Sequence, residues 1–353
     1  MNIRIVGAGL IGTSMGLGLL KGGHSICFED NSTQNRSIAQ DLLGESATFD
    51  RADLVIIATP IESLFSTLER EFALNPQAAF IDIAGLKSDL VFRVEEFPAL
   101  SERFCCTHPM AGREIAGPTG ARADLFQGAT WIVTPTKKTS SDVIECAKAI
   151  IGELGGVIRE VRADEHDRAI SSISHLPQII STILAGHISD LDEGAIALAG
   201  QGLRDMTRLA DSNPDLWVEL LISNSIFIAN DIREVQGKIS KLLTALEQSD
   251  KNIVKEILIE GNKGKSKIPG KHGKPSREYS FLPIVIDDKP GQLAAIFDEC
   301  AQTSVNVEDL FIEHSPGQDT GLITLALSHD DASVLRKHLV NQNWRVHDIR
   351  AQR

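Results

Sequence analysis

The sequence predicts an α/β domain, then an all-helical domain, and finally a small α+β domain. Three patterns support this division. Short apolar runs alternate with helical stretches over residues 1–162, as in sheets whose parallel strands are joined by helices. Helical periodicity without strand signals continues over residues 163–260. Strand signals return over residues 280–353, after a run rich in Gly, Lys and Pro at 261–279 that we interpret as a basic linker.

The charge and composition of the chain narrow the classes of function. A formal net charge of −13 over 353 residues argues against a nucleic-acid binder and against binding to an anionic membrane. No apolar run approaches the roughly 20 residues of a membrane helix, and the chain starts directly in a predicted strand. Five cysteines without a CxxC pair fit reduced thiols and show no metal-ligand spacing. We therefore expect a cytoplasmic protein with no signal sequence, no membrane contact and no metal.

A glycine-rich turn connects the first predicted strand to a helix. It begins at Gly7 and ends at Gly12, with Gly9, Leu10 and Ile11 between them. In such a unit the first glycine allows a tight turn, the second lets a pyrophosphate approach the backbone, and the third lets the helix pack on the strand. The first N–H groups of the helix and its positive dipole end also favour a phosphate. We predict a Rossmann-type domain in which these five residues contact a dinucleotide, and a glycine turn without a ligand is the alternative.

Acidic residues follow the second predicted strand, residues 25–28. An acid at this position accepts hydrogen bonds from the adenosine ribose, and its charge opposes a 2′-phosphate. Alternation along the strand places one of Glu29 and Asp30 against the sheet, and of the two we choose Asp30. This choice predicts NAD as the cofactor. Arg36 lies near enough in the sequence to accommodate a phosphate, so NADP is the alternative.

Five more strands complete the predicted sheet, together with a helix at residues 141–154. These strands are expected at residues 53–58, 79–83, 104–107, 129–134 and 156–160. Thr59 and Pro60 follow the first of the five, at the carboxyl edge where open α/β sheets bind their ligands. We therefore add Thr59 and Pro60 to the predicted cofactor-binding residues.

A polar stretch follows another of these strands, with the sequence Thr107-His108-Pro109-Met110-Ala111-Gly112-Arg113-Glu114. The proline favours an extended backbone at His108, and the small residues after it let another molecule approach closely. An imidazole at the sheet edge can take and return a proton near neutral pH. A lone histidine more often only bonds a loop carbonyl. This one shares an edge with Gly7 and Thr59, so we interpret His108 as a catalytic candidate.

Two clusters in the predicted helical domain carry chemistry. In Ser174-His175-Leu176-Pro177-Gln178, the proline is expected to kink the helix and aim His175 into a cleft, and a structural helix histidine is an equal alternative. Downstream, Asp205 and Arg208 are three residues apart, so one helix turn can present both on the same side. A guanidinium is the natural partner of a carboxylate, although a surface salt bridge is the usual fate of such a pair. A broad apolar stripe along these helices predicts a homodimer, with a monomer as the alternative.

Taken together, these residues resemble the prephenate and arogenate dehydrogenase family of tyrosine biosynthesis. The resemblance covers about residues 2–260. It rests on GAGLIG, HPMAGRE and SHLPQ, and on the series Gly202, Asp205, Arg208 and Trp217. It implies the oxidative decarboxylation of prephenate, or of arogenate, with NAD and without a metal. It also implies that His108 is the general base, that Arg208 clamps a substrate carboxylate, and that His175 contacts the other end of the substrate.

The same resemblance assigns further residues to substrate binding. It implies that Glu114 lies near the mouth of the pocket and that Trp217 forms part of its wall. Arg113 and Asp205 complete this predicted set.

One position departs from the family pattern. The family usually has a serine two residues before the lysine of the loop at residues 82–87, and this chain has Gly85 there. That serine would bond the substrate hydroxyl and steer the histidine. With Gly85, a water, Thr107 or Ser88 must take this part, or activity is lower. Gly85 is also the one feature that supports a different class of function, an amino-acid-sensing binding protein on an inactive dehydrogenase scaffold.

The last domain follows the order strand, helix, strand, strand, helix, strand, which resembles the ACT domain, a ligand-binding regulatory module. The turn at residues 288–293 matches the usual pattern of that domain through Pro290 and Gly291, and Asn306 falls where the family often contacts an amino acid. The resemblance implies feedback control by tyrosine or phenylalanine and pairing between two chains. A domain that only dimerises is the alternative.

Overall fold

A computed structural model describes residues 1–44, 47–113, 115–268, 279–314 and 319–351. The chain forms two compact units, residues 1–244 and residues 245–353. Within the described parts, no helix is both long enough and apolar enough to cross a bilayer.

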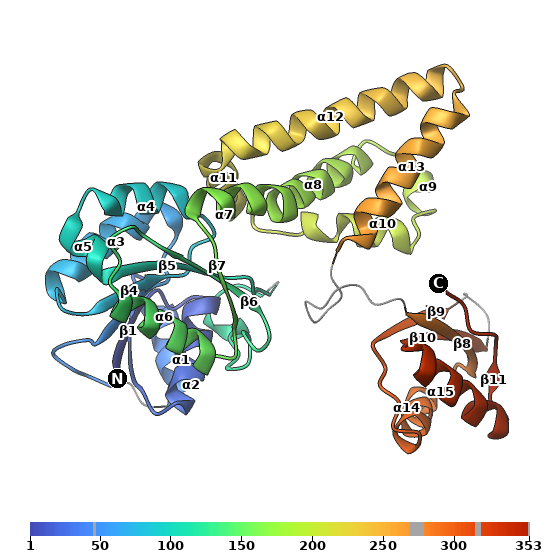
Figure 1. The fold of residues 1–353 in the computed structure, drawn as a ribbon, viewed down its shortest axis with the longest axis horizontal. Helices are drawn as coiled ribbons and strands as arrows, with labels where there is room; N and C mark the ends of the chain where they lie inside the picture. The colour runs from blue at the N-terminus through green and yellow to red at the C-terminus, as the bar shows by residue number, and fades with distance from the viewer. Residues whose placement is uncertain (45–46, 114, 269–278, 315–318, 352–353) are drawn as a thin grey trace. The chain divides into compact units, whose positions relative to one another are not determined.

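A seven-stranded sheet forms the first part of the chain, in the strand order β2-β1-β3-β4-β5-β6-β7 (Figure 1). Its strands are β1 (Asn2–Val6), β2 (Ser25–Glu29), β3 (Leu54–Ile57), β4 (Ala79–Asp82), β5 (Phe104–Pro109), β6 (Thr130–Pro135) and β7 (Val157–Glu160). Each predicted strand is confirmed to within one or two residues at its ends. Strands β1 to β5 pair in parallel, as their apolar runs predict.

Strand β6 interrupts the parallel arrangement, because it runs antiparallel to β5, and β7 is then parallel to β6. A parallel connection needs a crossover, usually a helix. The described part of the link between β5 and β6 contains only a 3₁₀ turn, Pro118–Gly120. The chain therefore leaves β5 and enters β6 at the same edge of the sheet, and the loop that starts at Met110 begins at the carboxyl edge of β5.

Alternate side chains of the strands fill two apolar cores, one on each face of the sheet. Helices α1 (Leu10–Lys21), α2 (Thr33–Leu43) and α6 (Ser141–Glu153) cover the face that includes Ile5 and Ile56. Helices α3 (Ile61–Leu74), α4 (Ser88–Glu95) and α5 (Pro98–Arg103) cover the face that includes Val55 and Ile57. Coverage on both faces confirms the Rossmann-type architecture expected for residues 1–162.

The glycine turn has the backbone geometry that its pattern predicts. Gly7 has φ +113°, and a Cβ there would lie 2.2 Å from the carbonyl oxygen of Ala58. A Cβ at Gly12 would lie 2.1 Å from the carbonyl oxygen of Gly7, whereas a Cβ at Gly9 would meet nothing within 4 Å. Helix α1 therefore packs tightly on the end of β1, and the backbone at Gly9 stays accessible.

Helices dominate the next part of the chain, as predicted. They are α7 (Ala163–Ile170), α8 (Leu176–Ile188), α9 (Glu193–Ile196), α10 (Gln201–Thr207), α11 (Pro214–Ser223), α12 (Ser225–Glu247) and α13 (Lys251–Ser266). Helix α13 continues past residue 261, where we expected the linker to begin, because a glycine costs a helix only about 1 kcal/mol. Most of the remaining predicted linker, residues 269–278, lies outside the described residues.

A π-helical turn, Ser171–His175, separates α7 from α8. Pro177 lacks the N–H that an α-helix would use at this point, so the preceding turn widens instead of continuing regularly. The kink predicted from Pro177 therefore takes the form of a π turn, and His175 is its last residue.

Residues 280–351 of the second unit form a four-stranded antiparallel sheet in the order β11-β8-β10-β9, with two helices (Figure 1). Its elements are β8 (Ser280–Asp287), α14 (Gln292–Gln302), β9 (Asp309–His314), β10 (Thr320–Leu327), α15 (His329–Asn341) and β11 (Arg345–Val346). A separate apolar core that includes Ile284, Ile296 and Leu335 joins the sheet to the helices. The predicted βαββαβ order is confirmed, and this strand order is that of the split βαβ fold.

We predict that Gly12→Ala lowers the stability of the fold. The added Cβ would lie 2.1 Å from the backbone oxygen of Gly7, and neither backbone segment can move without disturbing the strand below it. We expect a loss of about 1–3 kcal/mol in the free energy of unfolding, measured by thermal or urea denaturation. Gly152→Ala in α6 is the matched control, because a Cβ there meets nothing within 4 Å. Equal stabilities of the two variants would contradict this account.

Candidate active site

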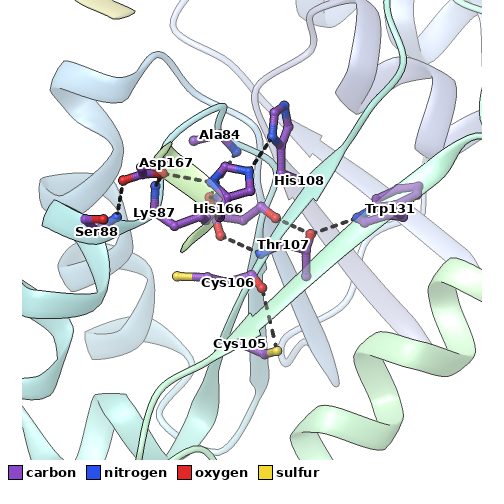
Figure 2. A network of polar contacts seen from close by, with 11 residues as sticks. Ala84, Lys87, Ser88, Cys105, Cys106, Thr107, His108, Trp131, His166 and Asp167 are labelled. Carbon is purple, nitrogen blue, oxygen red and sulfur yellow. Dashed lines mark hydrogen bonds and ion pairs between the residues drawn. The ribbon is translucent and has the colours of Figure 1, made fainter. Parts of the chain in front are cut away.

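The carboxylate of Asp167, in α7, is buried and receives several hydrogen bonds (Figure 2). Its Oδ1 accepts the backbone N–H of Lys87 at 2.9 Å, and its Oδ2 accepts the backbone N–H of Ser88 at 2.7 Å. The Nδ1 of His166 lies 2.7 Å from Oδ1. Because Lys87 and Ser88 follow β4 in the sheet domain, Asp167 ties that domain to the helices.

His166 in turn contacts His108 at the end of β5. The Nδ1 of His108 lies 2.9 Å from the Nε2 of His166, with the two rings nearly perpendicular. Figure 2 shows the three side chains as one chain of contacts, His108–His166–Asp167. In this arrangement a second group orients the base, and a buried carboxylate holds the second group in place. The same arrangement serves proton transfer in catalytic triads.

A buried ion pair holds the loop beneath this chain. The ammonium of Lys87 pairs with Asp82, and both side chains are fully buried. Asp82 also accepts the backbone N–H of Thr107 at 3.0 Å and that of Ala84 at 2.9 Å. The carboxylate therefore fastens the end of β4 to β5, directly before His108.

Burial and neighbouring charges keep His108 neutral. Although part of its surface stays exposed, desolvation lowers the pKa of His108 well below its ordinary value of 6.5, and the positive charge of Lys87 lowers it further. Desolvation would raise the pKa of Asp167, but its hydrogen bonds with His166, Ser88 and Lys87 outweigh this and lower that pKa. Near neutral pH the site thus holds a neutral imidazole and an ionised carboxylate.

Gly85 lies beside the outer nitrogen of His108. A Cβ at Gly85 would lie 3.9 Å from the Nε2 of His108 and 3.4 Å from the Cδ2 of Leu220. These are ordinary contact distances, so a Cβ fits there and would border the imidazole.

Neither of the two side chains that we expected to replace the family serine reaches this position. The hydroxyl of Thr107 donates to the backbone oxygen of Asp82 at 2.5 Å and accepts the indole N–H of Trp131 at 3.0 Å. Ser88 lines a separate cavity of about 530 Å³, whose lining includes Asp167 but neither His108 nor Gly85. Two of the alternatives for the missing serine remain. Either a water occupies its place at Gly85, or the activity is lower.

His175 is brought to the same network through Asn224. The Nδ2 of Asn224 lies 2.9 Å from the backbone oxygen of Asp167 and 3.2 Å from the Nδ1 of His175. The ring of Trp217, in α11, meets the ring of His175 edge-on at 5.9 Å. His175 and Trp217 therefore lie together, and desolvation lowers the pKa of His175.

Four other predicted site residues are Arg113, Glu114, Asp205 and Arg208. Asp205 is exposed in α10 and accepts a hydrogen bond from Gln201 at 2.8 Å, and Arg208 is exposed in the following 3₁₀ turn. Arg113 donates to the backbone oxygen of Gly120 at 2.7 Å, within its own loop. Glu114 lies outside the described residues. The substrate-binding roles of these residues stay predictions.

The predicted cofactor residues border the accessible backbone at Gly9. The carboxylate of Asp30 accepts the backbone N–H of Ala8 at 2.6 Å and that of Ser32 at 2.7 Å, so it lies against the glycine turn. Glu29 instead pairs with Arg4 at 3.4 Å. The hydroxyl of Thr59 is buried and has no hydrogen-bond partner among the described residues. The uncapped start of α1, the open Gly9 and this unpaired hydroxyl fit a bound dinucleotide.

Comparison with known proteins agrees with this geometry. The model of the prephenate dehydrogenase nucleotide-binding domain matches residues 19–160, and that of the prephenate dehydrogenase dimerization domain matches residues 162–260. This chain belongs to the prephenate dehydrogenase family. It is an oxidoreductase of that family, and its first domain binds a nicotinamide dinucleotide.

Individual members of the family show similarity along most of the chain. The prephenate dehydrogenase of Bacillus subtilis is 27% identical over 346 residues, which cover 90% of this chain and 91% of that protein. The arogenate dehydrogenase of Synechocystis is 27% identical, with a TM-score of 0.64 over 76% of this chain and 99% of that one. The prephenate dehydrogenase of A. aeolicus, in complex with hydroxyphenyl propionate and NAD+, is 25% identical, with a TM-score of 0.68 over 75% of this chain and 97% of that one.

Sequence reasoning missed several residues that build the site, namely His166, Asp167, Asn224, Lys87 and Asp82. The first two stand side by side in the run Asp164-Glu165-His166-Asp167, where an acid next to a histidine was an available signal. Asn224 has no such signal, because it reaches Asp167 across 57 residues of sequence.

We predict that the family activity persists in mildly acidic solution. The active form of His108 is the neutral imidazole, and its lowered pKa keeps that form populated below pH 6.5. Activity is therefore lost only as the pH falls through the lowered pKa. The pH profile of kcat/KM measures this, and an acidic limb at or above pH 6.5 would contradict the assignment.

We predict that Gly85→Ser leaves turnover unchanged or raises it. The Cβ of the added serine makes only ordinary contacts and lies 3.9 Å from the Nε2 of His108, so a serine rotamer can turn its hydroxyl towards that nitrogen. Steady-state kcat on the family substrates measures the effect, and Gly186→Ser in α8, where a Cβ meets nothing within 4 Å, is the control. A large loss in Gly85→Ser alone would show that this loop is built differently.

Proposed function

We propose that the protein is an NAD-dependent prephenate dehydrogenase, which converts prephenate to 4-hydroxyphenylpyruvate and CO2. The observation that carries this proposal is the neutral His108, held by His166 and Asp167 at the carboxyl edge of the sheet. A base in this place is needed where a ring hydroxyl must lose its proton while its carbon is oxidised.

The reaction follows from the position of this base. His108 takes the proton of the ring hydroxyl at Nε2 as the carbon loses its hydride, and the hydroxyl becomes a ketone. The ring carboxylate then leaves as CO2, and its bonding electrons make the ring aromatic. The phenolate recovers the proton from His108. When bound, the nicotinamide supplies the hydride acceptor, and Gly7, Gly9, Asp30 and Thr59 are the residues that would hold the dinucleotide.

The side arm of the substrate needs a hydrogen-bond donor, and a carboxylate of the substrate needs a cation. His175 lies against Trp217 close to the network of His108, so we assign it to the side arm of the substrate. We keep Arg208 as the partner of a substrate carboxylate, because a guanidinium binds a carboxylate through two parallel hydrogen bonds.

We also propose a homodimer. Large apolar side chains are exposed along the helical part of the first unit: Ile173, Ile183, Leu198, Met206, Leu216, Val218, Ile222, Ile226, Ile232, Ile239 and Leu243. Exposed apolar surface on this scale marks an interface, and the same helices match a dimerization-domain family.

Arogenate is the second candidate substrate. The comparison with the Synechocystis arogenate dehydrogenase, at 27% identity, supports it as well as the A. aeolicus comparison, at 25%, supports prephenate. The two substrates differ only in the arm, which is a keto acid in one and an amino acid in the other.

We propose that residues 280–353 are a regulatory domain of the ACT type that binds tyrosine or phenylalanine. Its βαββαβ order and antiparallel sheet support this assignment. Gly291 has φ +90° at the start of α14, which leaves an uncapped helix end next to Pro290. Asn306 lies between α14 and β9, where its Nδ2 donates to Glu308 at 2.9 Å.

The test is an assay of reduced nicotinamide by absorbance, with NAD or NADP, on prephenate and on arogenate, each with and without tyrosine or phenylalanine. We expect reduction with prephenate and NAD, and inhibition by one of the amino acids. Reduction only with arogenate would move the assignment to the second candidate. No reduction in any combination, with the protein folded, would favour the binding-protein hypothesis that Gly85 supports.

We predict that His108→Asn removes nearly all turnover while NAD still binds. Asparagine keeps a polar side chain at the end of β5 but cannot take a proton, and a general base contributes about 10²–10⁴-fold to the rate. Turnover and NAD affinity are measured on the same preparation, with His187→Asn, exposed on α8, as the control. Turnover that survives in His108→Asn would refute the assignment of the base.

A further inference from the structure

The hydrogen bonds around Asp167 determine which nitrogen of His166 carries a proton. An ionised carboxylate can only accept hydrogen bonds. The carboxylate of Asp167 already accepts the N–H groups of Lys87 and Ser88, which hold it in place. The Nδ1 of His166, 2.7 Å from Oδ1, must therefore donate. In the neutral ring this leaves a lone pair on the Nε2 of His166.

That lone pair determines the protonation of His108. The Nε2 of His166 accepts, so the Nδ1 of His108, at 2.9 Å, carries the proton and donates. The Nε2 of His108 is then the unprotonated nitrogen. Among the described residues it has no hydrogen-bond partner, and it is the ring atom nearest to the space above Gly85. His108 thus presents a proton acceptor to the site.

The backbone oxygen of Asp167 determines the protonation of His175 in the same way. A carbonyl oxygen only accepts, so it fixes the amide of Asn224 with its NH₂ group turned inward, at 2.9 Å. The second N–H of that group faces the Nδ1 of His175 at 3.2 Å. The Nδ1 of His175 must accept, and the proton of the neutral ring lies on Nε2.

We propose that Asp167 fixes the two histidines of the site in opposite neutral tautomers, with the proton of His108 on Nδ1 and the proton of His175 on Nε2. Asp167, His166 and Asn224 are the positioning residues. Through its carboxylate Asp167 makes His108 an acceptor, and through its carbonyl it makes His175 a donor.

The two tautomers define the ligand that the site accepts. It has a hydroxyl for the Nε2 of His108 and a carbonyl or carboxylate oxygen for the Nε2–H of His175. The chemical roles rest on the proposed function, whereas the tautomers follow from the hydrogen bonds alone. When the hydroxyl O–H bond breaks, an N–H bond forms at Nε2, and the resulting imidazolium keeps donating from Nδ1 to His166. The positive charge is thus shared towards the Asp167 carboxylate until the proton returns to the product oxygen.

The direct test is NMR of the imidazole nitrogens in the full-length protein, with isotope-labelled histidine, near neutral pH and without substrate. Protonated and unprotonated ring nitrogens are resolved by their chemical shifts, and His108→Gln, His166→Gln and His175→Gln assign the signals. We expect the proton on Nδ1 in His108 and on Nε2 in His175. The opposite tautomer in either ring, or a doubly protonated His166, would overturn the proposal.

A second test changes one tautomer alone. In Asn224→Asp the carboxylate can only accept, so it draws the proton of His175 to Nδ1, while His108 keeps its tautomer. Asn230→Asp on α12 is the control, because Asn230 is exposed and contacts Arg233 rather than the site. Unchanged His175 signals in a folded Asn224→Asp would contradict the proposal, and if that variant does not fold, the measurement on the unmodified protein decides.

Activity provides an independent readout. His166→Phe keeps a ring of similar shape without an acceptor, and we expect kcat to fall about 10²-fold or more with the KM for NAD unchanged. His166→Gln can accept from His108 and donate to Asp167, so we expect it to recover much of this loss. Equal losses in the two variants, or no loss in His166→Phe, would refute the positioning role. An unmodified protein that turns over neither prephenate nor arogenate would refute the proposed function and leave the NMR assignment to stand by itself.

Discussion

The buried carboxylate of Asp167 is the interaction on which the site depends. A carboxylate inside a protein needs hydrogen bonds from every side, because desolvation alone would neutralise it. Asp167 obtains them from the backbone of the loop after β4 and from His166. The same bonds that keep the charge stable in the interior also align the imidazoles of His166 and His108.

This constraint places the site where two domains meet. Lys87 and Ser88 belong to the α/β domain, and Asp167 belongs to the first helix after it. The loop that carries Lys87 is in turn fastened to β5 by Asp82, so the end of β5 and the start of α7 are held together. His108 is therefore positioned by contacts from both domains, while the glycine turn lies at the same edge of the sheet. The base and the predicted cofactor site lie at the same edge of the sheet, because the carboxyl ends of the parallel strands lie there.

Much of this arrangement follows from sequence patterns, because those patterns are local. The glycine turn, the apolar strands and the stretch after β5 each reflect the chemistry of neighbouring residues, so the seven strands and His108 are predictable. The antiparallel direction of β6 depends on the link from β5, whose described part has no crossover helix. The apolar periodicity of a strand does not tell in which direction that strand runs. The roles of His166 and Asn224 depend on partners 58 and 49 residues away, so no local pattern reveals them. Thr107 is one of the candidates to replace the family serine, but its hydroxyl is already bonded to Asp82 and Trp131.

The central claim is that Asp167 stays ionised inside the protein, since the proton assignments of His166 and His108 start from that charge. The most direct measurement is the NMR titration of its side-chain carboxyl carbon, with isotope-labelled aspartate and the signal assigned by Asp167→Glu. We predict a pKa below the ordinary value of 3.8, so that the signal stays that of a carboxylate over the whole pH range in which the protein is folded. A carboxyl that takes up a proton at or above 3.8 would contradict the account.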